Sequence, residues 1–119
     1  MDNKERRKAL LAQYKEMKTY MGAIQVKNNR NGKIFVAAYP NLKNKWLTLS
    51  AQLDAGRFAN AALQADWKEY GRDAFTCEVL EEKPADTADD VKWAVKQLQK
   101  AWINKLQPFG ENGYNKTPE

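Results

Sequence analysis

A tight turn between two short strand-like segments is the feature that most restricts how this 119-residue chain can fold. Residues 28–32 are dense in residues that tolerate a positive φ, and they end in an Asn-Gly pair, a strong hairpin signal. Residues 22–28 alternate in polarity with a period of two, and residues 33–38 form the returning segment. Strands joined by so short a connection must pair antiparallel. We therefore predict a β-hairpin.

An amphipathic segment precedes the hairpin. Within residues 4–19 and just beyond, apolar side chains recur at spacings of four, three and four, which is typical of one face of a helix: Leu10, Tyr14, Met17 and Met21. We predict an N-terminal helical extension over residues 1–21 and a single compact domain over residues 22–119. The chain length also favours one domain.

Two short helices are predicted after the hairpin. Asn41 follows a proline and suits the N-cap of a helix whose apolar stripe runs to Gly56, a residue type that commonly ends helices. A second helix is predicted between Asn60 and Gly71 for the same reasons.

A third strand and a long helix complete the pattern. Both faces of residues 75–80 are partly apolar, so we expect this strand in the interior of the sheet with a neighbour on each side, or covered on both faces. Residues 81–88 are predicted to form a polar loop. Thr87 and Asp90 resemble a capping box for a helix over residues 91–106. The order α-β-β-α-α-β-α predicts an α/β (α+β) layer architecture.

Composition excludes several classes of protein. No apolar run approaches the roughly 18–20 residues needed to cross a bilayer, and we expect no membrane partner. The lone Cys77 excludes an internal disulfide and fits a reducing cytosol, so we expect a cytoplasmic protein. With no His and one Cys, a zinc site would lack its usual ligands.

The net charge of +5 is unevenly distributed. Residues 1–45 carry eleven Lys/Arg against three Asp/Glu, whereas residues 46–119 carry nine against twelve. A basic half indicates an acidic partner such as nucleic acid, or an anionic membrane surface; the alternative is a solubilising face of solvated lysines.

Seven segments in unbroken order, over about four-fifths of the chain, resemble the GIY-YIG nuclease superfamily. They are residues 22–26, 31–37, 42–46, 63–71, 75–82, 102–106 and 113–115. The resemblance implies a three-stranded antiparallel sheet flanked by helices. The N-terminal extension is similar to that of small bacterial members of the superfamily.

The resemblance also assigns five positions to a catalytic site: Ile24, Phe35, Lys45, Gln99 and Asn115. Ile24 and Phe35 stand where active members have tyrosines. Lys45 stands in place of an arginine that neutralises the phosphate, and Gln99 in place of the glutamate that holds one divalent metal ion. Asn115 alone matches the family's residue.

Elementary chemistry argues against the family's reaction at these positions. Phosphodiester cleavage by a metal ion needs a carboxylate to hold the ion, and residues 91–106 contain no Asp or Glu. Ile24 and Phe35 cannot accept a proton, and lysine lacks the two-pronged grip of arginine on phosphate. We therefore expect no bound metal and no cofactor. Tyr39 and Tyr114 are the candidates for a replacement hydroxyl.

The basic residues are the candidates for nucleic-acid binding: Lys27, Arg30, Lys33, Lys43, Lys45, Lys92, Lys96 and Lys100. If the fold brings them to one groove, they can pair with a phosphate backbone. The preferred hypothesis is an inactive nuclease fold that binds DNA. Two alternatives stay open: a weak Mg²⁺-dependent endonuclease with a rearranged site, and a protein-interaction scaffold that uses the N-terminal helix.

Overall fold

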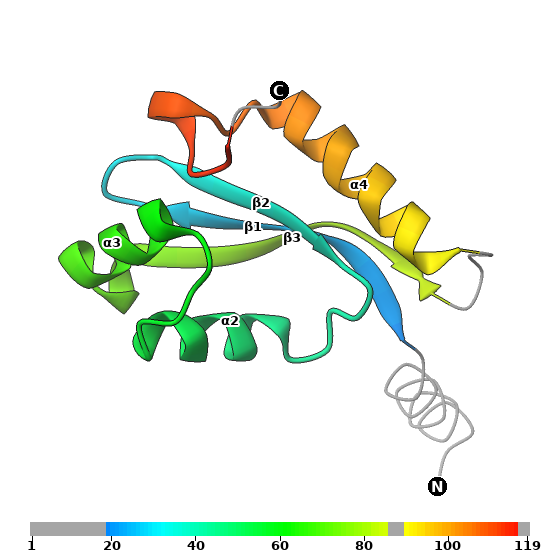
Figure 1. Ribbon diagram of the computed structural model, residues 1–119, viewed down its shortest axis with the longest axis horizontal. Coiled ribbons are helices and arrows are strands. Elements are labelled where there is room, and N and C mark those ends of the chain that lie inside the picture. Colours follow the sequence, from blue (N-terminus) through cyan, green and yellow to red (C-terminus); the bar gives the residue numbers. More distant parts are fainter. Residues whose placement is uncertain (1–18, 86–89, 117–119) are drawn as a thin grey trace, which may run out of the picture.

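The computed structural model describes residues 19–85 and 90–116. Its elements follow the chain in the order shown in Figure 1: β1 (Tyr20–Asn28), β2 (Ile34–Tyr39), α2 (Lys45–Asp54), α3 (Ala61–Tyr70), β3 (Phe75–Pro84) and α4 (Val91–Leu106). Two short 3-10 turns, Arg72–Ala74 and Gly110–Asn112, precede β3 and follow α4. The predicted N-terminal helix lies outside the described residues.

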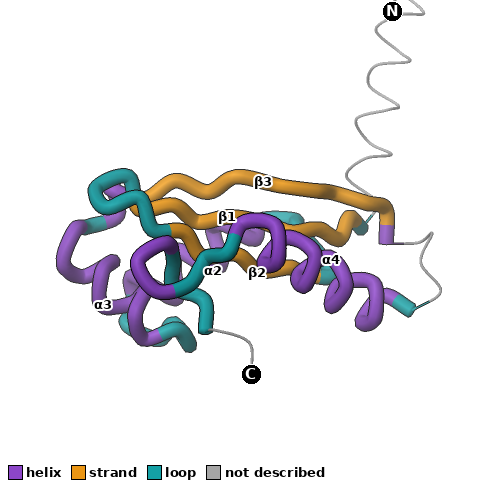
Figure 2. Tube along the Cα trace, turned by 90° about the horizontal axis from the view of Figure 1, so that it is seen from above, coloured by secondary structure: helices purple, strands orange, loops and turns teal. Residues whose placement is uncertain are grey.

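The three strands form one antiparallel sheet in the order β2-β1-β3, which Figure 2 shows from above. Helix α4 covers one face, and α2 and α3 cover the other (Figure 1). Each face has its own apolar core. Leu98 of α4 packs with Met21 and Ala23, whereas Leu63 of α3 packs with Val26 on the opposite face. The predicted three-stranded antiparallel sheet flanked by helices is confirmed.

The hairpin is confirmed, and its turn is held by backbone and side-chain bonds. The Asn28 N–H donates to Lys33 O at 2.9 Å, and the Gly32 N–H donates to Asn28 O at 2.8 Å. Gly32 has φ +78°, which costs little without a Cβ. The Asn28 carboxamide is fully buried and accepts from the Arg30 N–H.

Two predicted boundaries near the hairpin were wrong. Met21, assigned to the stripe of the N-terminal helix, belongs to β1 and is buried in the core beneath α4. Its position in that stripe was a coincidence of spacing, because a strand residue can also match a helical period. Asn41 does not cap α2, which begins at Lys45. Instead, its side chain accepts from the Lys43 N–H and forms a local turn.

The predicted interior position of the third strand was also wrong. β1 is central, and β3 lies at the edge with Val79 53% exposed. Residues 81–84, predicted as loop, extend β3, because they pair with the first residues of β1. Glu81 is held on the α4 side, where it accepts a hydrogen bond from the Trp102 indole at 2.9 Å.

The helix signals of the second half are mostly confirmed. Asn60 caps α3 by accepting from the Leu63 N–H, and Gly71 ends that helix at φ +85°. Asp90 is itself the N-cap of α4 and accepts from the Trp93 N–H. The predicted capping box, with Asp90 three residues after the N-cap, was therefore wrong. Thr87 lies outside the described residues. No helix in the described part of the chain combines the length and the apolar character that a membrane span requires.

Candidate functional site

A cavity of about 420 Å³ opens between β2, α2 and the segment after α4. Three of the five positions assigned by resemblance line it, namely Phe35, Lys45 and Asn115. Leu49 lines it as well. None of its lining residues is Asp or Glu. We call it the β2–α2 cavity.

Apolar side chains occupy the two positions that the resemblance matches to tyrosines. Ile24 is 2% exposed, lies opposite Ala37 in the sheet and does not line the cavity. Phe35 does line it, and its ring meets Phe58 edge-on at a centroid distance of 5.6 Å. Neither side chain has a group that can hold or transfer a proton.

Tyr39 contributes a phenolic hydroxyl to the lining of the β2–α2 cavity. The Lys45 Nζ lies 4.5 Å from the centroid of its ring, a cation–π contact. Burial, with a smaller contribution from nearby Cys77, raises the pKa of Tyr39 above its usual value. Tyr39 therefore keeps its proton at neutral pH and is a poor general base.

Tyr114, the other candidate hydroxyl, is committed to structure. It is 5% exposed, donates to Asp66 at 2.7 Å and accepts from the Asn28 carboxamide at 3.1 Å. Burial, reinforced by the bond to Asp66, raises the pKa of Tyr114 to about 12. It does not line the β2–α2 cavity.

Gln99 and Asn115 are bonded to the outer edge of β2, the edge that does not face β1. The Asn115 carboxamide accepts from the Val36 N–H at 2.9 Å and donates to Val36 O at 2.8 Å. Gln99 reaches the same edge from α4 and accepts from the Ala38 N–H at 3.1 Å. Both oxygens are thus occupied by backbone donors.

These residues do not fit a divalent metal ion. The oxygen of Gln99 is neutral and already bonded, and the β2–α2 cavity lacks the carboxylates that Mg²⁺ prefers. Across residues 19–85 and 90–116, no group of three or more His, Cys, Asp or Glu could hold an ion. The arrangement can offer positive charge to a phosphate, but it offers no ligand set for a metal.

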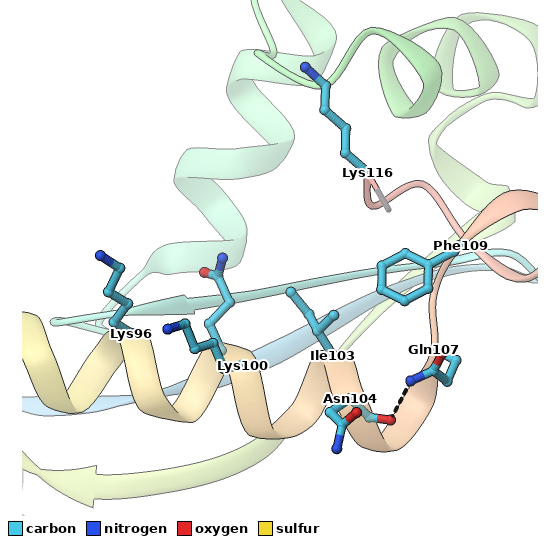
Figure 3. Close-up of a pocket in the computed structure, with 8 residues that line it drawn as sticks. Lys96, Lys100, Ile103, Asn104, Gln107, Phe109 and Lys116 are labelled. Carbon is cyan, nitrogen blue, oxygen red and sulfur yellow. Dashed lines mark hydrogen bonds between the residues drawn. The ribbon is translucent and has the colours of Figure 1, made fainter. Parts of the chain in front are cut away.

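A second concavity, of about 470 Å³, lies beside α4 on the other side of the β2 edge, and we call it the α4 groove. Figure 3 shows Lys96, Lys100 and Ile103 along one face of α4, with Phe109 beyond the end of the helix and Lys116 across from it. Gln99 also lines this groove and not the β2–α2 cavity. Lys116 lines both.

The structure divides the predicted basic residues. Lys45, Lys96 and Lys100 line one of the two concavities. The others do not line either: Lys27, Arg30 and Lys33 lie at the hairpin, Lys43 precedes α2, and Lys92 is exposed at the start of α4.

Sequence reasoning missed Lys116, Phe109 and Ile103. A signal existed for Ile103, because it continues a second helical stripe beside the core stripe of α4: Lys96, Gln99, Lys100, Ile103, Asn104 and Gln107. Phe109 and Lys116 follow the helix, and only the folded path of the tail brings them to the groove.

Solved structures of an intron endonuclease domain share this fold. The catalytic domain of the homing endonuclease I-TevI is 28% identical and superposes with a TM-score of 0.68 over 82% of this chain and 99% of that chain. A mutant form of the same catalytic domain gives a TM-score of 0.67 at 28% identity, over 81% of this chain and 92% of that one.

A curated relative agrees. An intron-associated endonuclease of Enterobacteria phage T4 is 29% identical over 94 residues, which is 79% of this chain and 36% of the relative. The chain thus spans about a third of that relative's length. No family model matches the chain. The shared fold and the sequence similarity both support the resemblance of this chain to the GIY-YIG nuclease superfamily.

Proposed function

We propose that this protein binds DNA through the lysines around the β2 edge and does not cleave it. The observation that carries this proposal is the chemistry of the β2–α2 cavity. It presents Lys45 without any carboxylate, and the Asn115 carboxamide that lines it is bonded to Val36. A phosphate can be attracted there, but no metal ion is held to activate water.

The distribution of charge supports binding. Lysines from three separate segments converge on the two concavities beside β2: Lys45 from α2, Lys96 and Lys100 from α4, and Lys116 from the tail. The relatives named above are endonucleases, proteins that act on nucleic acid. A fold that keeps the positive charge of such a protein and loses its acidic ligand suits binding without hydrolysis.

Binding is tested by fluorescence anisotropy with a labelled DNA duplex across a salt series. We expect the affinity to fall steeply between about 50 and 200 mM salt, because bound lysines release counterions from the phosphates. The Lys45→Gln variant should bind more weakly and show a shallower salt slope, whereas Lys68→Gln on the exposed face of α3 serves as the matched control. No detectable complex at the lowest salt would refute the proposal.

Absence of cleavage is tested by incubating supercoiled plasmid with Mg²⁺ or Mn²⁺, with chelator as the control. We expect no nicked product above the background of the chelated sample.

One observation favours the alternative of a weak endonuclease with a rearranged site. Tyr39 places a hydroxyl in the β2–α2 cavity next to Lys45. This alternative predicts metal-dependent nicking that the Tyr39→Phe substitution abolishes. Nicking that survives in Tyr39→Phe would show that the Tyr39 hydroxyl takes no part in the reaction.

A further inference from the structure

The α4 groove combines an apolar floor with a cationic rim. Ile103 and Phe109 are half-buried and provide the apolar surface, whereas Lys96, Lys100 and Lys116 are exposed around it. The volume of about 470 Å³ falls within the range of about 300–1,000 Å³ typical of small-ligand pockets. A ligand with a flat apolar body and negative charges beside it matches this surface.

The positive charge of the groove is not neutralised by its own helix. The sequence of α4 contains no Asp or Glu. Among the described residues, ion pairs join Arg72 to Asp54 and Lys83 to Glu81, and neither pair includes a lysine of the groove. An anion bound there therefore does not compete with an internal carboxylate.

Phe109 is positioned by the fold of the tail. Gln107 ends α4 in a left-handed conformation at φ 49°, and its side chain donates to Asn104 O at 2.7 Å (Figure 3). Pro108 is buried, and its carbonyl accepts from the Asn115 N–H at 3.0 Å. The ring is therefore presented to a ligand from an ordered turn, which reduces the entropy lost on binding.

Polar amides complete the groove. The Gln99 oxygen is bonded to the Ala38 N–H, which leaves its NH₂ group as a donor. Asn104 lines the groove with a second exposed carboxamide. Such groups recognise the edge of a heterocyclic base, which carries both donors and acceptors.

We propose that the α4 groove binds one unpaired nucleotide of a single-stranded DNA segment. The base packs on Ile103 and Phe109, and Lys96 and Lys100 contact the adjacent phosphates. In a duplex each base face is covered by its neighbours, so only an unpaired base can reach the floor of the groove. This inference rests on the proposed function, because it assumes that DNA is the ligand.

The test compares the affinity of the whole 119-residue chain for two DNAs, a blunt duplex and the same duplex carrying a single-stranded tail. We expect the tailed DNA to bind about fivefold more tightly or better, the gain that stacking of one base on an aromatic ring supplies. The Phe109→Leu substitution should remove the preference for tailed DNA. The Phe109→Tyr substitution keeps an aromatic ring and should retain that preference. A fluorescent base analogue in the tail should be quenched by the wild-type protein and not by Phe109→Leu.

The lysines are tested with a matched pair of double variants. Lys96→Gln with Lys100→Gln should weaken binding of the tailed DNA and reduce its salt slope by about 1.4, or 0.7 for each contact to a single strand. Lys68→Gln with Lys105→Gln removes the same charge from exposed positions outside the groove. That control should change the slope much less.

The outcomes separate the two proposals. Equal affinity for blunt and tailed duplexes would overturn the proposal that the α4 groove binds a nucleotide, and it would leave DNA binding intact. A preference for tailed DNA that persists in Phe109→Leu would have the same consequence. Failure to bind either DNA at low salt would overturn both proposals.

Discussion

Gln99 and Asn115 illustrate how a single side-chain amide differs from a carboxylate. An amide offers both a donor and an acceptor, whereas an ionised carboxylate only accepts. Asn115 uses both groups on Val36, so its role requires an amide. Gln99 uses only its oxygen on Ala38, so a glutamate could make the same bond. The two positions therefore tolerate different substitutions.

Gln99 gives a prediction about how much its hydrogen bond to Ala38 contributes to stability. The Gln99→Leu variant leaves the Ala38 N–H without its partner, so we expect the free energy of unfolding to fall by about 1–3 kcal/mol. Gln99→Glu keeps an acceptor and should lose less. Urea denaturation of both variants measures the difference. Equal losses would show that the bond to Ala38 contributes little to stability.

Tyr114 gives a prediction about pH. Its folded pKa of about 12 exceeds the value of about 10 expected in the unfolded chain. Below pH 10 Tyr114 is protonated in both the folded and the unfolded chain, and its full contribution to the stability of the fold is present. Between about pH 10 and 12 the unfolded state loses the proton first, so stability falls as pH rises.

The Tyr114→Phe variant isolates this effect from the other titrating groups. At neutral pH it should be less stable by about 1–3 kcal/mol, because buried Asn28 loses its acceptor. The gap between wild type and variant should narrow as the pH rises from about 10 to 12. Chemical denaturation at a series of pH values measures it, and a constant gap would contradict the raised pKa.

At the scale of elements, β2 is an edge strand whose outer backbone groups are paired by side chains and tail. Ile34 O accepts from the Tyr114 N–H, Val36 is bonded to Asn115, and the Ala38 N–H donates to Gln99. Pairing of this kind stabilises the edge and removes a template for aggregation. Phe35 and Tyr39 of this strand line the β2–α2 cavity, so the pairing also fixes one wall of that cavity.

Asn115→Asp should damage this edge more than Asn115→Ala. The carboxylate cannot donate to Val36 O, and it places negative charge against that carbonyl. We expect faster amide hydrogen exchange at Val36 in both variants and the larger increase in Asn115→Asp at neutral pH. Protonation of the aspartate at low pH should reduce the difference. Unchanged exchange at Val36 would show that the amide clamp does not hold the edge.

Local signals in the sequence predicted the elements better than their partners. The hairpin, the cap at Asn60 and the stop at Gly71 depend on neighbouring residues, and all three are confirmed. The edge position of β3 depends on pairing with β1, some fifty residues earlier in the sequence, and its apolar faces pointed to the interior instead. The composition of a strand does not reveal whether that strand lies at the centre or at the edge of the sheet.

The candidate site shows the same limit. Resemblance identified Gln99 and Asn115, but their bonds join residues 61 and 79 positions apart, and no periodicity encodes such contacts. The α4 groove was missed because Phe109 and Lys116 reach it only through the folded tail.

At the scale of the whole molecule, two sets of four basic residues occupy different regions of the fold. One set, Lys45, Lys96, Lys100 and Lys116, lines the concavities on either side of the β2 edge. The other set belongs to the hairpin and the approach to α2: Lys27, Arg30, Lys33 and Lys43. Composition treats the two sets alike, whereas the fold assigns the first set to concave surfaces, where contacts with a phosphate backbone can be made from several sides.

Two quadruple variants test which region contacts DNA. Each replaces one of these sets with glutamine, so both lose four positive charges and keep similar side-chain lengths. Replacing the set beside β2 should lower the slope of log affinity against log salt by up to about 3.6 on duplex DNA, since each lost phosphate contact contributes about 0.9. Replacing the hairpin set removes equal net charge and should change the slope by less than half as much. Anisotropy titrations with one duplex across a salt series measure both slopes. A larger loss in the hairpin variant would place the DNA at the hairpin and remove the β2 edge from the interface.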